Sequence, residues 1–246
     1  MTLKGHASPT LLSTYELERI PVIADMLKIT TELFNRTVSS TFQDEVELQK
    51  AVEAAADQQL DDKERSPWHR GRKLFQLDLN YRWSPAVVDE RFVDEQTVRN
   101  AYGVAGQEVR AGDRAPDAPE LKIVQAVGDG QTTRLFDIFK PIMHTVLLFG
   151  SESVPIFQPS LEIIRSLPRE LVKVVLILAP GRKAQGEVGL VDLVVEDTKD
   201  YAREDYGLKD TTAPVVVLVR PDGMIGAVAT SERGVAKYIS AVFSRS

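Results

Sequence analysis

The stretch "TAPVVVLVRPDGMIGAVA", residues 212–229, decides the fold. Two apolar runs lie on either side of Pro221 and Gly223, which suit a type I turn, so the stretch predicts a β-hairpin. The next stretch, "SERGVAKYISAVF" at residues 231–243, predicts a helix that begins at Ser231, because serine is a favoured N-cap residue. The carboxy-terminal end therefore predicts a hairpin followed by a helix.

Upstream of the hairpin, strand patterns alternate with helix patterns. "HTVLLFG" (144–150), "LVKVVLIL" (171–178) and "LVDLVVE" (190–196) are short apolar runs that predict strands covered on both faces. "SLEIIRSL" (160–167) predicts a helix, and "TKDYAREDYGL" (198–208) predicts another that Gly207 ends. This order of elements is similar to a thioredoxin fold. We therefore predict an α/β protein with a thioredoxin-like carboxy-terminal domain, residues 121–246, preceded by a helical amino-terminal region.

The thioredoxin resemblance also says where redox chemistry would lie. Residues 150–153 read Gly-Ser-Glu-Ser at the place where thioredoxin-like proteins carry redox cysteines, and the chain has no cysteine at all. This excludes disulfides, thiolate metal sites and dithiol redox mechanisms. Pro214 stands where these proteins carry a cis-proline, so we expect the Ala213–Pro214 peptide bond to be cis.

Composition and charge exclude several other classes. The 246 residues include 30 basic and 36 acidic side chains, a formal net charge of -6, with no long basic run to neutralise a phosphate backbone or an anionic bilayer. No apolar run approaches the roughly 20 residues that span a bilayer, and the amino terminus does not have the layout of a signal peptide. We expect a cytoplasmic protein without nucleic-acid or membrane partners. The 3 histidines lack ligand spacing, so we expect no metal site.

Residues 1–120 predict a helical region followed by an irregular linker. Apolar residues fall at helical spacing from Ile23 to Val38, and Pro21 suits a first turn or a kink after a shorter segment, Leu11–Arg19. An alanine-rich stretch, Asp44–Leu60, predicts another helix. Residues 61–120 are rich in turn signals and read as irregular.

Five stretches, taken together and in this order, resemble the carboxy-terminal part of phenol-hydroxylase-type FAD-dependent aromatic monooxygenases over nearly the whole chain. The resemblance implies that flavin-binding and substrate-binding parts come before such a segment, and that the thioredoxin-like domain is associated with dimerisation. The stretches are "LKGHASPTLLSTYELERIPV" (3–22), "NYRWSP" (80–85), "RAGDRAPDAPEL" (110–121), "TRLFDIFKPIMHTVLLFG" (133–150) and "LVRPDGMIGA" (218–227).

The flavin-binding motifs of that family do not occur in this chain. No G-x-G-x-x-G opens a βαβ unit that could hold a pyrophosphate on a helix amino terminus. We therefore predict no cofactor and no bound flavin. The chain is expected to be either a fragment of a larger enzyme or a stand-alone descendant that has lost the cofactor.

Two aromatic and basic clusters are the candidates for a site. In "WHRGR", residues 68–72, the titratable ring of His69 lies beside Trp68 and Arg70 in the sequence. In "NYRWSP", the aromatic residues Tyr81 and Trp83 flank Arg82, whose planar guanidinium suits a phenolate or a carboxylate. The competing interpretations are a solvated basic loop for the first and an interdomain packing element for the second, and we favour packing for "NYRWSP". His144, at the entrance of a buried strand, is expected to be structural or merely exposed. The candidate catalytic residues are His69, Tyr81 and Arg82, and the candidate substrate-binding residues are Trp68, Arg70 and Trp83.

Two classes of function follow. The first is a non-catalytic dimerisation or interaction module, a stand-alone carboxy-terminal domain of a phenol 2-monooxygenase-like aromatic-ring hydroxylase. The second is a cofactor-free isomerase, cyclase or hydrolase that acts on an aromatic or polyketide-like secondary metabolite, since proton transfer on a phenol needs only positioned acids and bases. The expected partners are a second copy of the chain, a separately encoded flavin-binding domain, and a small aromatic ligand. An apolar stripe that includes Leu27, Leu33, Phe34 and Val38 is expected to be covered in a homodimer or tighter oligomer, either by the second copy or by a repacked loop of residues 61–120.

Overall fold

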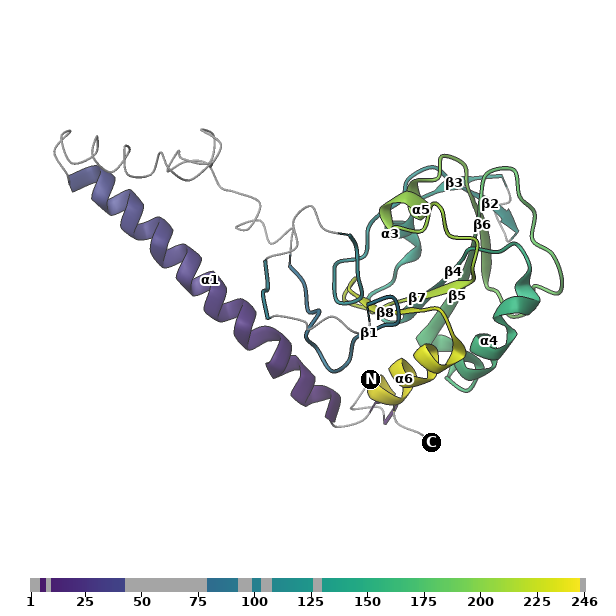
Figure 1. The fold of residues 1–246 in the computed structure, drawn as a ribbon, viewed down its shortest axis with the longest axis horizontal. Helices are drawn as coiled ribbons and strands as arrows, with labels where there is room; N and C mark the ends of the chain where they lie inside the picture. The colour runs from purple at the N-terminus through teal and green to yellow at the C-terminus, as the bar shows by residue number, and fades with distance from the viewer. Residues whose placement is uncertain are drawn as a thin grey trace. The chain divides into compact units, whose positions relative to one another are not determined.

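The structure is a computed structural model that describes residues 5–7, 10–42, 79–92, 99–102, 108–125 and 130–243 (Figure 1). The chain divides into two compact units. Unit 1 contains residues 1–18, 80–99 and 106–246, and unit 2 contains residues 19–79 and 100–105. Residues 80–92 and 108–120 form backbone hydrogen bonds with the carboxy-terminal sheet. The boundary that the sequence predicts between residues 120 and 121 stays a prediction. The predicted helix Asp44–Leu60 lies outside the described residues.

Unit 1 is built on a mixed sheet of 8 strands in the order β1-β8-β7-β4-β5-β6-β2-β3. β4, β5 and β6 run parallel to one another, whereas β7 is antiparallel to both β4 and β8. The strands are β1 (Val88–Asp89), β2 (Leu121–Gln125), β3 (Thr132–Thr133), β4 (His144–Phe149), β5 (Val172–Leu178), β6 (Leu193–Asp197), β7 (Val215–Val219) and β8 (Ile225–Ala229).

The four neighbouring strands β8, β7, β4 and β5 have the connectivity of a thioredoxin fold: a βαβ unit followed by a hairpin and a helix. The hairpin turn is closed by a hydrogen bond from the Gly223 N–H to the Arg220 carbonyl oxygen, 3.0 Å, with Pro221 at the second turn position. The predicted fold class, an α/β protein with a thioredoxin-like domain preceded by a helical region, is therefore confirmed.

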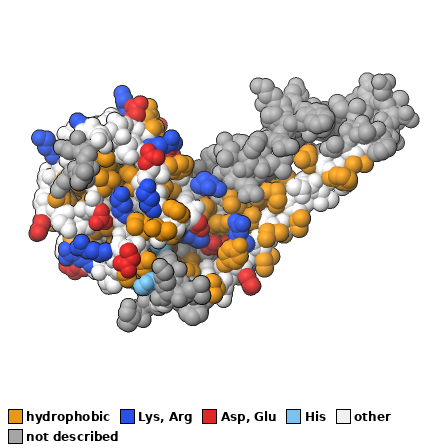
Figure 2. All heavy atoms as spheres, turned by 180° about the vertical axis from the view of Figure 1, so that it is seen from behind, with side chains coloured by type: hydrophobic (Ala, Val, Ile, Leu, Met, Phe, Trp, Pro, Cys, Tyr) orange, Lys and Arg blue, Asp and Glu red, His pale blue; other side chains and the backbone are white. Residues whose placement is uncertain are grey.

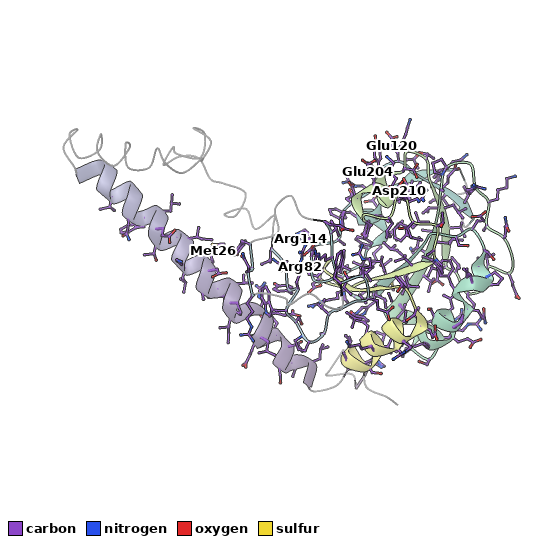
Figure 3. All side chains as sticks on the ribbon, in the orientation of Figure 1. Met26, Arg82, Arg114, Glu120, Glu204 and Asp210 are labelled. Carbon is purple, nitrogen blue, oxygen red and sulfur yellow. The ribbon has the colours of Figure 1, made fainter. Side chains whose placement is uncertain are left out.

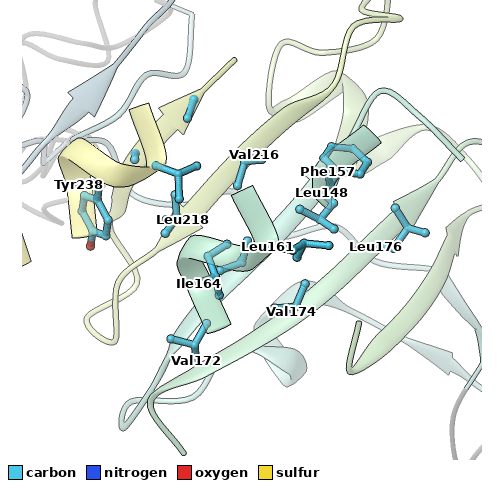
Figure 4. Close-up of a cluster of buried hydrophobic side chains, with 14 of the residues drawn as sticks. Leu148, Phe157, Leu161, Ile164, Val172, Val174, Leu176, Val216, Leu218 and Tyr238 are labelled. Carbon is cyan, nitrogen blue, oxygen red and sulfur yellow. The ribbon is translucent and has the colours of Figure 1, made fainter. Parts of the chain in front are cut away.

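Helices cover both faces of this sheet because side chains in each strand alternate between the faces. Val146 and Leu148 of β4 join a cluster with α4 and α6, whereas Leu147 and Phe149 join a cluster on the other face with α3 and α5 (Figure 4 shows part of the first cluster). The helices are α3 (Leu135–Ile138), α4 (Gln158–Arg165), α5 (Tyr201–Asp205) and α6 (Glu232–Val242), with short 3-10 turns η3 (Val154–Phe157) and η4 (Arg169–Leu171).

The predicted strands and helices of residues 144–243 are confirmed, and the caps behave as expected. The Ser231 hydroxyl accepts a hydrogen bond from the Gly234 N–H at the start of α6, and Gly207 follows α5 with a φ of 67°. The sequence did not reveal β1, β2, β3 or α3. These elements are short or partly exposed, so their apolar pattern is weak.

The expectation of a cis Ala213–Pro214 bond is wrong, because no peptide bond within the described residues is cis. In the trans arrangement the Ala213 carbonyl lies against Gly150, which has a φ of 87°. A Cβ added at Gly150 would clash with the Ala213 carbonyl oxygen. The two segments that meet at the active site of redox thioredoxins therefore meet here backbone to backbone.

Residues 10–42 form one continuous helix, α1 (Thr10–Phe42), with Pro21 inside it. Its residues 10–18 belong to unit 1 and residues 19–42 to unit 2. Of the predicted stripe, Leu27, Phe34 and Val38 are exposed, whereas Leu33 is half-buried. Within the described part of the chain no helix is long and apolar enough to cross a membrane.

Candidate functional site

A buried ion pair joins α1 to the hairpin of unit 1. Arg220 donates from its two terminal nitrogens to the two carboxylate oxygens of Glu18, at 2.7 and 3.0 Å, and Glu18 is 3% exposed. The Ser84 hydroxyl donates to the same carboxylate at 2.7 Å. Arg220 also donates to Asp222 in its own turn, at 2.7 Å. Three segments that are far apart in the sequence therefore meet at one carboxylate, which we name the Glu18 cluster: Glu18, Ser84, Arg220 and Asp222.

The charge of Arg220 is fixed by this environment. Burial by itself would lower the pKa of its guanidinium, but the hydrogen bond to Glu18 and the negative charges of Asp222 and Glu18 raise that pKa above its ordinary value. Arg220 therefore stays charged, and both carboxylate oxygens of Glu18 accept hydrogen bonds from it.

Arg82 forms a second bidentate pair. Its Nε and Nη2 atoms each donate to one oxygen of Asp113, both at 2.7 Å, and Nη2 also donates to the Glu108 carbonyl at 3.0 Å (Figure 3 labels Arg82). Asp113 accepts a further hydrogen bond from the Arg110 N–H at 2.9 Å. Planar guanidinium and carboxylate groups match each other in this geometry, so the pair fixes "NYRWSP" to the loop of residues 110–114.

Gly112 brings the backbones of these two segments together. The Tyr81 N–H donates to the Gly112 carbonyl at 2.6 Å, and the Gly112 N–H donates to the Ile225 carbonyl of β8 at 2.7 Å. Gly112 has a φ of 95°, and a Cβ there would stand 2.6 Å from the Arg82 backbone. A glycine is needed here both for the left-handed conformation and for the close approach.

Tyr81 and Trp83 complete this part of unit 1. Tyr81 is buried, its ring meets the Trp83 ring edge-on at a centroid distance of 6.1 Å, and the Arg220 guanidinium lies 5.9 Å from its ring centroid. The Trp83 indole N–H donates to the Leu17 carbonyl in α1 at 3.0 Å. The structure therefore gives Tyr81, Arg82 and Trp83 three different sets of partners. The roles predicted for them in catalysis and binding stay predictions, and Trp68, His69 and Arg70 lie outside the described residues.

His144, which the sequence analysis expected to be structural or merely exposed, forms a buried pair with Tyr238. The His144 Nε2 and the Tyr238 hydroxyl are 3.1 Å apart, and His144 is 2% exposed. Burial, and then the positive charge of Arg220, lower the pKa of His144 from 6.5 to about 4, so its ring is neutral at pH 7. Burial likewise raises the pKa of the Tyr238 phenol, so both partners stay uncharged.

The place of the thioredoxin cysteines carries polar groups that contact the protein itself. The Ser151 hydroxyl accepts from the Ser153 N–H at 3.0 Å, and Glu152 lies 3.7 Å from Arg182. Beside Pro214 a cavity of about 210 Å³ lies between the first turns of α4 and α6. Another, of about 580 Å³, lies between the end of α4 and α6 and is lined mainly by apolar side chains. Neither cavity is lined by Tyr81, Arg82 or Trp83.

Within the described residues, no group of three or more histidine, aspartate or glutamate side chains is arranged to hold a metal ion.

Sequence reasoning missed the roles of Glu18, Ser84 and Arg220. All three lie within stretches that carry the family resemblance, but the Glu18–Arg220 pair joins positions 202 residues apart, and one sequence does not show which of its polar residues meet.

Comparisons with known proteins point to hydroxylases. No family model matches the chain. A flavin-dependent monooxygenase of Mycobacteroides abscessus is 28% identical over 236 residues, 96% of this chain and 32% of that protein. Pentachlorophenol 4-monooxygenase of Sphingobium chlorophenolicum is 27% identical over 241 residues, 95% of this chain and 37% of that protein. The homologues are thus flavin-dependent monooxygenases, and the chain spans about a third of their length.

A solved structure gives the same result for the fold. The flavin-dependent monooxygenase PieE, in complex with FAD and substrate, superposes with a TM-score of 0.58 and 19% identity, over 98% of this chain and 42% of PieE. At this identity the likeness concerns the fold. The chain is therefore homologous to part of hydroxylase-type monooxygenases and shares a fold with part of one of them.

Proposed function

We propose that this chain is the carboxy-terminal part of a phenol 2-monooxygenase-like aromatic-ring hydroxylase and acts as a dimerisation or interaction module that binds no flavin itself. The homology to about a third of the length of two monooxygenases supports the assignment of the chain to part of a hydroxylase. The absence of a glycine-rich phosphate-binding motif from the sequence supports the lack of flavin binding.

One observation carries the proposal: the polar side chains of the motifs are used to hold the protein together. Arg82 is paired with Asp113 through two hydrogen bonds, and Glu18 is paired with Arg220 and Ser84. A catalytic acid or base needs a free proton position directed at a substrate. Side chains engaged in this way favour a structural role for unit 1.

The surface for a partner is the exposed apolar face of α1. A row of large apolar side chains on one helix face is unfavourable in water and marks an interaction site. Two partners are compatible with a chain that is part of a hydroxylase. One is a second copy of the chain, and the other is a separately encoded polypeptide that supplies the flavin-binding part.

The alternative, a cofactor-free enzyme acting on an aromatic secondary metabolite, requires Tyr81 and Arg82 to reach a ligand. Tyr81 is 4% exposed and Arg82 would have to leave Asp113. Breaking such a partly buried pair leaves a charge without its partner, which is costly. The module is therefore the function that the geometry favours.

Titration of the purified chain with FAD and with small phenols, followed by calorimetry and by the flavin absorbance band, tests the proposal. We expect no saturable binding of either. Stoichiometric binding of a phenol that Arg82→Ala abolishes and Arg165→Ala, an exposed control on α4, leaves intact would overturn the module and establish the enzyme alternative. Flavin that co-purifies with the chain would overturn the flavin-free part of the proposal.

A further inference from the structure

We infer that residues 86–91 form a strap that closes the outer edge of β8, and that Glu90 is the latch that holds this strap on α6. Such a strap is a conformational device within unit 1, and it does not depend on the proposed function. Four features of the structure support it: the edge that the strap covers, the shortness of β1, the groups that receive the Glu90 carboxylate, and the glycine that lies against that carboxylate.

β8 (Ile225–Ala229) has an apolar edge that needs a cover. All 5 of its residues are buried, none is charged, and β7 pairs with one of its two sides. On the other side, the Ile225 N–H donates to the Asp113 carbonyl at 2.8 Å, so the loop around Asp113 covers one end. The strap covers the other end, where Val88 of β1 pairs with Ala227 (Figure 1). An open apolar edge is a template for pairing with strands of other chains, so the strap protects the sheet.

The strand pairing of the strap is too short to hold it by itself. β1 has 2 residues, paired in parallel with β8, and the Glu90 N–H adds a hydrogen bond to the Val228 carbonyl at 3.0 Å. Strands in proteins are usually about 3–10 residues long, and parallel pairing is slightly weaker per residue than antiparallel pairing. The side chains of Ala86 and Val88 add apolar contacts with the core. A strap with so few backbone hydrogen bonds needs a further anchor.

The anchor is the Glu90 carboxylate, which lies at the amino terminus of α6. One of its oxygens accepts hydrogen bonds from the N–H groups of Thr230 and Ser231, at 2.8 and 2.9 Å, and the other accepts from the Ser231 hydroxyl at 2.8 Å. The amino terminus of a helix has N–H groups without partners in the helix and a partial positive charge, so it favours a carboxylate. We name these N–H and hydroxyl groups of Thr230 and Ser231 the cradle.

The partners of Glu90 differ from those of other acidic side chains in unit 1. Figure 2 shows one face of the molecule, on which acidic side chains of unit 1 lie close to basic ones. Asp117 pairs with Arg134, and Glu204 pairs with Lys209. Among the described residues Glu90 forms no ion pair, and its carboxylate is hydrogen-bonded to the uncharged groups of the cradle. The carboxylate therefore ties the strap to one place, the first turn of α6.

Gly234 leaves the space that the Glu90 carboxylate occupies. It lies within α6 and does not have a left-handed backbone, and glycine at such a position weakens a helix. A Cβ added there would stand 2.5 Å from the carboxyl carbon of Glu90 and 2.9 Å from the Cβ of Ala229. A glycine is therefore needed here for the close approach of these two side chains rather than for its backbone conformation.

The strap is also tied to the other segment that covers β8. Asp89 accepts a hydrogen bond from the Ala111 N–H at 2.9 Å, and Arg91 donates to the Val109 carbonyl at 2.8 Å. The two covers are thus joined to each other, and Glu90 is the side chain that joins the strap to α6. Opening of the strap is local, because β7, β4 and β5 keep their own pairing.

Hydrogen exchange of single backbone amides tests the latch. The Glu90 N–H reports on the strap, and the N–H groups of Thr230 and Ser231 report on the cradle. In Glu90→Ala we expect all three to exchange about tenfold faster or more, because hydrogen bonds to a charged group are among the stronger ones. Glu90→Gln, which keeps an oxygen acceptor without the charge, is expected to lie between Glu90→Ala and the original chain. The amides of β4 and β5 are expected to keep their rates.

Glu232→Ala is the matched control. Glu232 is an exposed acid in the first turn of the same helix, so its removal takes the same charge from the same helix end without touching the strap. Added acetate then separates the cradle from the strap. In Glu90→Ala, acetate fills the cradle and slows exchange at residues 230 and 231, but the amide of residue 90 stays fast, because acetate is not joined to the strap. Chloride at equal ionic strength restores neither.

Four results would overturn the latch. Unchanged exchange at residue 90 in Glu90→Ala shows that the strap is held without the carboxylate. Equal acceleration in Glu232→Ala assigns the effect to the charge at the helix end. Faster exchange throughout β4 and β5 shows that Glu90 supports the whole domain rather than the strap. Slower exchange of residue 90 on addition of acetate shows that a filled cradle, and not a joined side chain, keeps the edge of β8 closed.

Discussion

The indole N–H of Trp83 donates to the carbonyl oxygen of Leu17, at 3.0 Å, and this is the carbonyl that Pro21 leaves without a donor inside α1. In an α-helix the N–H of residue 21 would bond to the carbonyl of residue 17, but proline has no N–H. Trp83 supplies the missing hydrogen bond from a different segment of the chain. The aromatic residue of "NYRWSP" thus allows the helix to continue through its proline.

The first prediction follows from this substitution of donors. Trp83→Phe keeps most of the ring but removes the N–H, and we expect it to lower the free energy of unfolding by about 0.5–1.5 kcal/mol, the usual net value of one hydrogen bond. Pro21→Ala restores the intrahelical donor. In the Pro21→Ala background, Trp83→Phe is expected to cost distinctly less. Urea unfolding of the two single variants and the double variant measures the coupling, and strictly additive changes would contradict the account.

The second prediction concerns the Glu18 cluster. Glu18→Gln leaves the buried Arg220 guanidinium with only the more exposed Asp222 as a charged partner, so we expect a loss of about 3–5 kcal/mol in the free energy of unfolding. Asp222→Asn removes the more exposed acid on the same arginine and is expected to cost less than about 1 kcal/mol. Denaturant titrations of the two variants test this. Equal losses in the two variants would show that the buried Glu18–Arg220 pair contributes no more to stability than the exposed Asp222–Arg220 pair.

The third prediction is a loss of stability in mild acid that depends on His144. The pKa of His144 is about 4 in the folded chain and 6.5 ordinarily, so the unfolded chain binds more protons between these values. The contribution of the neutral ring is complete above pH 6.5 and declines as the pH falls towards 4, by about 3 kcal/mol in total, because one pKa unit is worth about 1.4 kcal/mol.

The slope of stability against pH is the measurement for this effect. His144→Phe removes the titrating ring, and although it also removes the hydrogen-bond partner of Tyr238, it should flatten the dependence between pH 6.5 and 4. A variant that keeps the slope of the original chain would place the titration elsewhere.

The sequence predicted the parts of the fold whose pattern is local. The strands from His144 to Ala229 are apolar runs closed by turn residues, and Ser231 and Gly207 mark helix ends, so each could be read from its own neighbourhood. The Glu18 cluster could not be read in this way. Its members are polar residues in three separate segments, and only the folded chain shows that Arg220 meets Glu18.

The cis-proline expectation failed for a related reason. Pro214 lies directly before β7, as the pattern requires, but the position of a proline in the sequence does not fix the isomer of its peptide bond. The Ala213 carbonyl lies against Gly150, a residue without a Cβ, and this contact is made across the sheet rather than along the chain.

The last prediction uses that contact. Gly150→Ala has two costs: the left-handed backbone, φ 87°, and a Cβ that clashes with the Ala213 carbonyl oxygen. Gly223→Ala has a similar φ of 80° but meets nothing within 4 Å, so it carries the backbone cost alone, about 1–2 kcal/mol. We expect Gly150→Ala to lower the melting temperature clearly more than Gly223→Ala, because the clash forces two backbone segments apart. Similar melting temperatures for the two variants would show that the backbones of residues 150 and 213 are not in close contact.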